Sequence, residues 1–325
     1  MMESLYSKLI RRFRFLIEII RRVKNWPSLL LFFTGFKQNV TLVFRSGIAV
    51  KIDKSKINLV YYLIKIHSIA RVVLTNNNMC KLVLSCSEEL VFSLDDESSI
   101  YRVYVLSCLY KKLNIKFYQD FCEFYFQGKK VKYFYDQKDF SSVAVLCMTF
   151  VDEQYGELNV KGRVVADIGA GYGDTTIYFA LKGAKKVYAY EPIPWIVELL
   201  EKNIKHNNLT ETVKICPYAV SSTKGNARIS IPKTATDAAS LKYNFKGADV
   251  IQISVKTVTP PEDVEVVKLD CEGCEYDIIL NWLKSKLYDE ILMEYHEDYK
   301  SLERKLRKLG YKVKIQLDRH LLFAR

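Results

Sequence analysis

The chain has 325 residues, of which 49% are hydrophobic, so it can bury a sizeable core and is long enough for two domains. Its formal net charge of +12 permits an anionic partner (nucleic acid, a membrane surface or an acidic glycan) without choosing among them. No apolar run approaches the length of a membrane span, the start is too charged for a secretory signal, and the eight cysteines form no paired framework. We therefore expect a cytoplasmic protein without a disulfide scaffold.

The first predicted element is a basic amphipathic helix over residues 5–24. Residues 1–24 contain seven Lys or Arg and two Glu, and apolar residues from Leu5 to Val23 recur at helical spacing. Such a helix can dock peripherally on an anionic membrane. It can equally pack its apolar face on its own domain, and we favour packing because any surface helix is amphipathic.

Short alternating runs then predict a small α+β accessory domain, which we place at residues 1–145. A hairpin is predicted over 41–52, further strands at 71–74, 81–85 and 90–94, and a helix over 101–113. Residues 116–135 are dense in aromatic residues, with three lysines among them and a turn at Gly128-Lys129. They could form a stacking surface for single-stranded nucleic acid. Because aromatics are also good strand and core residues, we favour the accessory-domain interpretation.

The second predicted domain, residues 146–325, opens with a strand, a glycine-rich turn and a helix. Val164–Ile168 is apolar around one acid, Gly169-Ala170-Gly171-Tyr172-Gly173 follows, and a helix begins at Asp174-Thr175. Glycines let a ligand approach the backbone, and free N–H groups at a helix start favour polar ligand atoms. A second strand over 185–190 ends at Glu191, placed 18 residues beyond Gly173, where an acid can accept hydrogen bonds from a ribose.

Two cofactors fit this unit, a nicotinamide dinucleotide and S-adenosylmethionine. The glycines are spaced G-x-G-x-G, whereas the dinucleotide fingerprint is G-x-G-x-x-G, and Asp167 and Asp174 flank the turn. An acid on each side would repel a pyrophosphate and attract a cationic ligand that carries a sulfonium and an amino group. The residues therefore favour S-adenosylmethionine.

The remaining elements continue the alternation of strands and helices. A helix over 195–207 precedes strands at 213–216, 227–231 and 250–255, with a polar insertion over 233–247 that contains Ser240. A fourth main strand over 265–269 leads to a helix over 274–283, and a fifth strand over 289–295 to a helix over 299–309. A final antiparallel hairpin is predicted from 311–317 and 320–324. The pattern predicts an α/β fold with a mostly parallel sheet.

Candidate catalytic residues follow the fourth and fifth strands. Asp270 and Glu272 come directly after residues 265–269, and ligands bind at the carboxyl ends of such strands. A carboxylate there could take a proton from an acceptor hydroxyl, although both acids could instead cap the next helix. Glu294 and His296 should reach the same rim, where His296 could be a base, a substrate ligand or structural.

Cys271-x-x-Cys274 has the spacing of redox and zinc sites. No second close pair of ligands accompanies it, so we expect two small side chains at a tight junction and no metal.

Three motifs together resemble the FkbM-type family of class I S-adenosylmethionine-dependent methyltransferases. They are Asp167 with the glycine turn, Glu191-Pro192, and the segment from Lys268 to Glu275, although the family more usually has small apolar residues at Cys271 and Cys274. The resemblance covers about residues 150–325. It implies a class I Rossmann-like sheet with a C-terminal antiparallel hairpin, and O-methylation of a sugar, glycan or other small molecule. It implies cofactor contacts from Asp167, Gly169, Ala170, Gly171, Gly173, Asp174, Thr175, Glu191, Pro192, Tyr218, Ala219 and Asp270, and lid residues Glu153 and Tyr155.

Two other functions remain open at this point. The chain could be an RNA methyltransferase that holds RNA with its basic aromatic N-terminal domain, or a cofactor-fold module that only binds. Methylases of amino groups on bases carry an Asp/Asn-Pro-Pro-aromatic stretch after the fourth strand, but here Pro260-Pro261 precedes that strand. The intact acids make a silent module the least favoured, and the sequence does not predict an oligomeric state.

Overall fold

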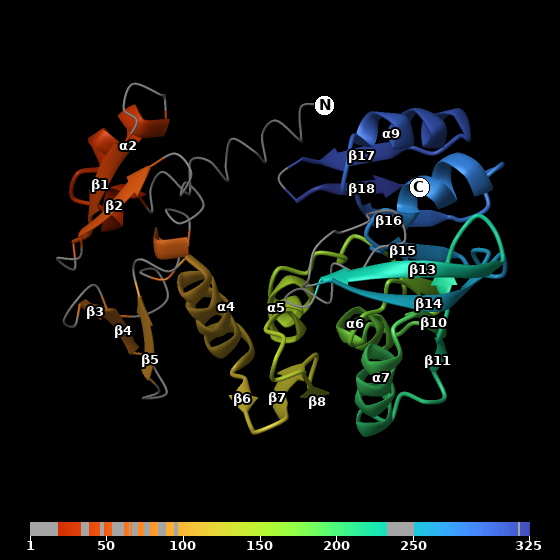
Figure 1. Ribbon diagram of the computed structural model, residues 1–325, viewed down its shortest axis with the longest axis horizontal. Helices are drawn as coiled ribbons and strands as arrows, with labels where there is room; N and C mark the ends of the chain where they lie inside the picture. Colours follow the sequence, from red (N-terminus) through yellow and green to blue (C-terminus); the bar gives the residue numbers. More distant parts are fainter. Residues whose placement is uncertain are drawn as a thin grey trace. The chain divides into compact units, whose positions relative to one another are not determined.

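The computed structural model describes residues 19–33, 39–45, 49–53, 62–64, 66, 71–74, 79–83, 89–93, 97–232, 250–317 and 319–325 (Figure 1). Contacts divide the chain into two compact units, Met1–Asn114 and Ile115–Arg325. The sequence predicted a division after residue 145, so residues 115–145 lie in a different unit from the one expected. In the described part of the chain, no helix is long and apolar enough to cross a membrane.

The first unit contains the predicted accessory strands. The helix α2 (Trp26–Phe33) precedes an antiparallel pair, β1 (Asn39–Val43) and β2 (Ala49–Asp53). A second antiparallel sheet comprises β3 (Arg71–Leu74), β4 (Met79–Val83) and β5 (Glu89–Ser93), and α4 (Glu97–Leu113) ends the unit.

The predicted helix over 5–24 lies mostly outside the described residues. Of its predicted apolar face, Val23 is buried in one core cluster with Ile19, Leu29 and Leu42, and Ile20 is partly buried. The end of this helix that the structure describes therefore packs on its own unit.

The second unit begins with an antiparallel sheet of β6 (Lys116–Phe117), β7 (Phe121–Phe126) and β8 (Lys129–Phe134). Its hairpin turns at Gln127-Gly128, both with positive φ, one residue before the predicted turn. Inward aromatics of β7 pack on Phe150, with ring centroids 4.9 Å from Phe124 and 5.1 Å from Phe126. Phe150 lies in η2, a π-helical turn over Cys147–Val151 that follows α5 (Ser141–Leu146).

Side-chain amides also attach this hairpin to the helix α7 (Pro194–His206). Asn203, fully buried, accepts a hydrogen bond from the Phe134 N–H at 2.6 Å and donates to the Phe134 carbonyl at 3.0 Å. Asn207 repeats the arrangement with both backbone groups of Lys132. Because these bonds satisfy the free edge of β8, residues 115–134 are an integral part of the second unit.

A seven-stranded sheet of order β11-β10-β9-β15-β16-β18-β17 forms the centre of this unit. Its strands are β9 (Val164–Ile168), β10 (Lys186–Tyr190), β11 (Val213–Cys216), β15 (Val266–Leu269), β16 (Glu290–Glu294), β17 (Val313–Gln316) and β18 (Leu321–Ala324). All neighbours pair in parallel except β18, which is antiparallel to both β16 and β17. Nearly continuous burial along β9 and β15 explains their apolar runs. The predicted fold is confirmed: this is the mostly parallel class I sheet with its closing hairpin.

Helices α6 (Asp174–Leu181) and α9 (Tyr299–Lys308) flank the sheet, together with α7 and α8 (Cys274–Tyr276), which continues into the π-helical segment η4 (Asp277–Trp282). A separate three-stranded sheet joins β12 (Ala219–Val220), β13 (Gly225–Pro232) and β14 (Val250–Val258). The predicted insertion over 233–247, with Ser240, lies outside the described residues. The strand order reverses between β9 and β15, so a ligand cleft is expected at their carboxyl ends.

Candidate active site

A cavity of about 240 Å³ opens at the carboxyl ends of β9, β10 and β15. The glycine turn forms one wall through Gly169, Ala170 and Gly171, and the loop after β15 forms another. Other predicted residues on its lining are Tyr155, Asp174, Thr175, Glu191, Pro192, Tyr218, Ala219, Asp270, Glu272 and Glu294. Most of the candidate residues that the sequence predicted therefore line one cleft.

Two glycines of the turn are required by close packing. Gly169 has φ +78°, and a Cβ there would overlap the backbone carbonyl oxygen of Asp270. Gly173 has φ +93°, and its Cβ would meet the Leu200 Cδ1 at 2.5 Å. Gly173 is therefore a packing residue at the start of α6, and it is not part of the cleft lining.

Glu191 at the end of β10 is 6% exposed and faces the cleft. Its Oε2 accepts from the Gly171 N–H at 3.1 Å and its Oε1 from the Ile193 N–H at 2.9 Å. Burial raises the pKa of Glu191 to about 7, even though these two N–H groups favour the carboxylate. Each oxygen keeps a free lone pair, so the side chain can still accept hydrogen bonds from a ligand.

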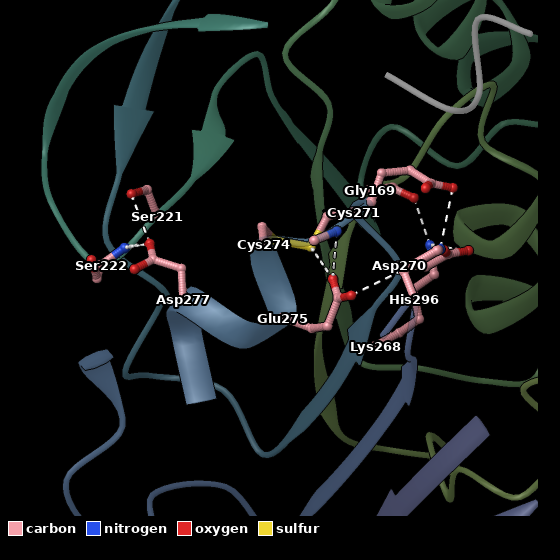
Figure 2. The surroundings of a disulfide bond; sticks show 12 residues. Gly169, Ser221, Ser222, Lys268, Asp270, Cys271, Cys274, Glu275, Asp277 and His296 are labelled. Atoms are coloured by element: carbon pink, nitrogen blue, oxygen red, sulfur yellow. Dashed lines mark hydrogen bonds and ion pairs between the residues drawn. A yellow bond between two sulfur atoms is a disulfide. The ribbon is translucent and has the colours of Figure 1, made fainter. Parts of the chain in front are cut away.

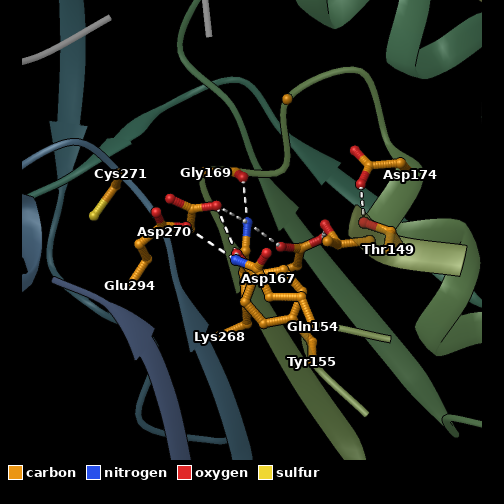
Figure 3. A network of polar contacts seen from close by, with 12 residues as sticks. Thr149, Gln154, Tyr155, Asp167, Gly169, Asp174, Lys268, Asp270, Cys271 and Glu294 are labelled. Carbon is orange, nitrogen blue, oxygen red and sulfur yellow. Dashed lines mark hydrogen bonds and ion pairs between the residues drawn. The ribbon is translucent and has the colours of Figure 1, made fainter. Parts of the chain in front are cut away.

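A buried polar network lies beneath the glycine turn (Figure 3). It contains Asp167, which the sequence analysis expected to contact the cofactor. Asp167 accepts hydrogen bonds from the hydroxyls of Thr175 and Thr176 at 2.7 and 2.6 Å, and lies 3.2 Å from the Lys268 Nζ. It is fully buried and absent from the cleft lining, so Asp167 organises the turn rather than contacting a ligand.

Lys268 was not among the predicted site residues. Its ammonium donates to the Gly169 carbonyl at 2.5 Å and lies 3.8 Å from the Asp270 carboxylate. Burial by itself would lower the pKa of Lys268, but the carboxylates of Asp167, Asp270 and Asp174 outweigh burial and raise it. A lysine inside the otherwise apolar strand Val266–Leu269 was the sequence signal that could have identified it.

On the opposite side of the cleft, Asp270 lies beside two residues from other elements (Figure 3). The Tyr155 hydroxyl donates to the Asp270 Oδ2 at 2.7 Å, and Gln154 donates to Glu294 at 3.0 Å. Burial, followed by the Asp270 charge, raises the pKa of Glu294 to about 8. Glu294, with its raised pKa, therefore faces the same cleft as the Asp270 carboxyl group.

His296, after β16, is held between Glu272, in the loop that precedes α8, and Glu275, in α8 itself. Its Nδ1 lies 2.9 Å from Glu275, which is fully buried, and its Nε2 lies 3.3 Å from Glu272 (Figure 2). Burial would lower the pKa of His296, but the two carboxylates raise it to about 11. Asp270, Glu272 and His296 offer ligand atoms within 4.8 Å of one another, so a cation could be shared there; both imidazole nitrogens, however, already face carboxylates.

The same loop corrects the expectation for its cysteines. Cys271 and Cys274 form a disulfide, whereas two separate small side chains were predicted (Figure 2). The tight strand–helix junction brings their Cα atoms to 5.4 Å, which is within the range that a disulfide spans.

The remaining candidates divide between the cleft and its surroundings. Asp174 lines the cleft and accepts a hydrogen bond from Thr149, and burial raises its pKa to about 6. Glu153 does not line it: its carboxylate accepts from the Tyr178 hydroxyl at 2.9 Å and lies 3.6 Å from the Lys182 Nζ. Of the two predicted lid residues, only Tyr155 reaches the cleft.

A second cavity, of about 280 Å³, adjoins the first and shares Met148 and Glu294 with it. Its other lining residues are polar: Asp152, Gln154, Arg319 and His320. Neither Arg319 nor Gln154 was singled out from the sequence, because they come from a turn and a loop without a motif. The two cavities therefore meet at Met148 and Glu294, while Asp270 lines the first cavity alone.

Comparisons with known proteins agree with this geometry. Residues 167–313 match the family model described as the methyltransferase FkbM domain. Uncharacterized protein 65 of Sulfolobus islandicus filamentous virus (isolate Iceland/Hveragerdi) is 24% identical over 155 residues, which span 48% of this chain and 73% of that protein.

Two further proteins are similar over different shares of their length. The tRNA (guanine(37)-N(1))-methyltransferase Trm5b of Methanocaldococcus jannaschii is 35% identical over 132 residues, which span 37% of each protein. Among solved structures, Aeropyrum pernix fibrillarin with natively bound S-adenosyl-L-methionine covers 79% of this chain and 100% of its own, with 13% identity and a TM-score of 0.34.

Proposed function

We propose that this chain, an S-adenosylmethionine-dependent methyltransferase whose residues 167–313 form an FkbM methyltransferase domain, methylates a hydroxyl group of a sugar, glycan or other small molecule. The observation that carries the proposal is the pair of carboxyl groups, Asp270 and Glu294: both line the cofactor cleft, and Glu294 also lines the second cavity. An acceptor hydroxyl must lose its proton as it is methylated, and a carboxylate within hydrogen-bond reach can accept that proton.

The charges on the cleft lining fit the cofactor. Five acids line it (Asp174, Glu191, Asp270, Glu272 and Glu294), and Lys268 is the single basic side chain among the described lining residues. This balance attracts a sulfonium and an amino group and repels a pyrophosphate. Glu191 would accept hydrogen bonds from the ribose, and Tyr190, Ile193 and Tyr218 supply flat or apolar surface for a base. S-adenosylmethionine supplies a methyl group already activated by its sulfonium.

Within this site, the protein's own residues have separable roles. Tyr155 and Lys268 orient the Asp270 carboxylate, through a hydrogen bond of 2.7 Å and an ion pair of 3.8 Å. Glu294, whose pKa is raised to about 8 by burial and the Asp270 charge, is matched to proton exchange near neutral pH. His296 is a poor base, because its pKa of about 11 keeps it protonated between two carboxylates. We therefore assign proton removal to Asp270 and Glu294, and to His296 and Glu272 a role in orienting the loop.

RNA is the second candidate acceptor, because the 35% identical relative is named as a tRNA methyltransferase. On the sheet β6-β7-β8, Tyr118 and Tyr125 are 45% and 66% exposed, and Lys129 and Lys130 are exposed beside them. However, Lys130 pairs with Glu123 and Lys202 with Asp120, so part of this positive charge is already neutralised. We rank RNA behind a small hydroxylated acceptor for that reason.

One experiment separates the two acceptors. The full chain is incubated with methyl-labelled S-adenosylmethionine and separate glycan, lipid and RNA fractions, with Asp270→Asn as the control for enzyme-dependent label. The proposal expects label in a glycan or small-molecule fraction, in an ether that survives mild alkaline hydrolysis. Label that is confined to RNA, and is lost with ribonuclease, would replace it with the second candidate.

A further inference from the structure

The disulfide between Cys271 and Cys274 lies inside the candidate active site. Both residues line the cofactor cleft, directly after Asp270 and on either side of Glu272 and Gly273 (Figure 2). Cys271 is half-buried, whereas Cys274 is 4% exposed. Among cysteines whose side chains the structure describes, the others (Cys108, Cys122, Cys147 and Cys216) are buried. The bridge is therefore the cysteine pair that a soluble thiol could reach.

The bridged loop has an unusual backbone. Glu272 has φ +53° and Gly273 has φ +106°, so two successive residues are in conformations with positive φ. A glutamate rarely adopts such a conformation, and it persists only where the surroundings hold it. The bridge spans these two residues and closes the loop around them.

This loop positions the charges on the acceptor side of the cleft. Glu275 accepts from the Gly273 N–H at 2.9 Å and contacts the His296 Nδ1, while Glu272 faces the His296 Nε2. Glu191 and Gly171 lie elsewhere, directly after β10 and in the turn after β9, and Glu191 accepts hydrogen bonds from Gly171 and Ile193. A change in the loop would therefore act on Glu272 and His296 before it reached the cofactor-binding wall.

We propose that Cys271 and Cys274 form a reversible redox site that controls methyl transfer: the bridged form holds Glu272 against His296, and the reduced form releases the loop. The reductant is a dithiol. Its thiolate attacks the sulfur of Cys271, the more exposed residue, and expels the Cys274 thiolate, which takes up a proton. The second thiol of the reductant then displaces Cys271 from the mixed disulfide, so that two protein thiols and one reductant disulfide result. Two electrons pass from the reductant to the protein.

The redox site itself is tested without any acceptor. The full chain, with and without excess dithiothreitol, is alkylated under denaturing conditions and analysed by peptide mass spectrometry. Cys271 and Cys274 are expected to react only after reduction. In native protein, reduction should speed deuterium uptake at residues 271–275 by about tenfold or more, while uptake in β9 stays constant. Alkylation of both cysteines in air-oxidised protein would overturn the proposal.

A second measurement follows the imidazole. In the bridged form the His296 ring should remain protonated well above neutral pH, and reduction should lower its titration midpoint by about one pH unit or more. The chain has four histidines, so the His296 resonance can be assigned with a His296→Gln variant. An unchanged midpoint after complete reduction would show that the bridge does not control this contact.

The effect on catalysis rests on the proposed function and uses matched variants. Cys271→Ser/Cys274→Ser should reproduce the reduced wild type, with turnover lower by about tenfold or more, cofactor affinity within about threefold, and no response to dithiothreitol. Cys122→Ala, which removes a buried cysteine outside the cleft, should keep both full turnover and the response. Equal turnover of bridged and reduced wild type would remove the switch but leave the methyltransferase proposal intact. If no acceptor is found, the alkylation and exchange results still decide whether the redox site exists.

Discussion

Glu191 shows how one side chain can serve the fold and a ligand together. Its two oxygens accept from the N–H groups of Gly171 and Ile193, so the carboxylate fixes the glycine turn and the start of the next loop. It is nevertheless part of the cleft lining, with a pKa raised by burial to about 7. Substitution of such a residue should weaken ligand binding more than it slows the chemical step.

We predict that Glu191→Ala weakens S-adenosylmethionine binding by at least about tenfold, because each hydrogen bond to a carboxylate contributes about 1.5–3 kcal/mol. Calorimetric titration of the purified protein measures the dissociation constant. Glu198→Ala, at an exposed position of α7, is the control and should bind normally. Normal cofactor affinity in a folded Glu191→Ala protein would contradict the assignment.

Asp270→Asn should have the opposite effect and slow turnover while leaving cofactor binding nearly unchanged. Asparagine can still accept the Tyr155 hydrogen bond but has no charge and cannot act as a base. We expect turnover to fall by about 100-fold, with cofactor affinity within a few-fold, and the defect to shrink at high pH as the acceptor ionises. Single-turnover assays over a pH series measure this, with the exposed Asp263→Asn as the control. Unchanged turnover would show that Asp270 is not the base and would leave Glu294 as the candidate.

His296 gives a prediction about stability and pH. Its folded pKa of about 11 lies above the unfolded value of 6.5, so the folded state binds the proton more tightly. The stabilisation is complete below pH 6.5 and is lost as pH rises toward 11. Thermal melts of wild type and His296→Gln should differ most near pH 6 and converge at alkaline pH. A difference that does not vary with pH would mean that His296 acts through packing alone.

At this scale the sequence identified most of the lining but misassigned several roles. Asp167 and Gly173 were expected to contact the cofactor, and the structure assigns them to the interior. Their spacing in the motif is the same whether they touch a ligand or support the residues that do. Gln154 was missed because a hydrogen bond between distant segments leaves no local pattern, whereas Lys268 was missed although its charge interrupts an apolar strand.

Among the elements, the strand–turn–helix unit of β9, the glycine turn and α6 was the most predictable. The predicted bounds of β9 are confirmed, because an apolar run of this length followed by glycines is too short for a buried helix. The helix after β15 was less regular than predicted, since α8 passes into the π-helical segment η4 after three residues. Asp277, where the change occurs, accepts hydrogen bonds from Ser221 and Ser222 of another loop, and the local sequence does not encode such contacts.

A pair of glycine variants separates backbone strain from crowding in this unit. Gly162 has φ +73° and open space at its Cβ position, so Gly162→Ala should cost only the backbone strain of about 1–2 kcal/mol. Gly169→Ala adds overlap with the Asp270 carbonyl to a similar φ, and should destabilise the protein by at least about 3 kcal/mol. Denaturant unfolding measures both. Equal losses would show that the loops after β9 and β15 can move apart at little cost.

For the whole molecule, the division into units was the least predictable feature. Aromatic residues become dense just after residue 114, but this aromatic hairpin looks from its sequence like part of a small accessory domain. Its membership of the second unit depends on long-range contacts: the rings around Phe150 and the amides of Asn203 and Asn207. No periodicity in the sequence reports such contacts.

The fragment 115–325 should therefore fold cooperatively and bind S-adenosylmethionine with the affinity of the full chain. The fragment 146–325, cut at the position predicted from the sequence, should melt at a clearly lower temperature, because it exposes Phe150 and leaves the buried Asn203 without two of its three backbone hydrogen bonds. Circular dichroism melts compare the two fragments. Equal melting temperatures would show that residues 115–145 do not stabilise the second unit and would support a boundary at residue 145.

The amides that hold β8 also bear on how this protein ages. Asn203 donates from one nitrogen to the carbonyls of Phe134 and Tyr172, at 3.0 and 2.9 Å, and accepts a single N–H through its oxygen. Deamidation would replace that nitrogen with an oxygen and set a negative charge against two carbonyl oxygens in a fully buried place. The loss of one nitrogen atom would thus remove both of these hydrogen bonds and weaken the attachment of the hairpin to α7.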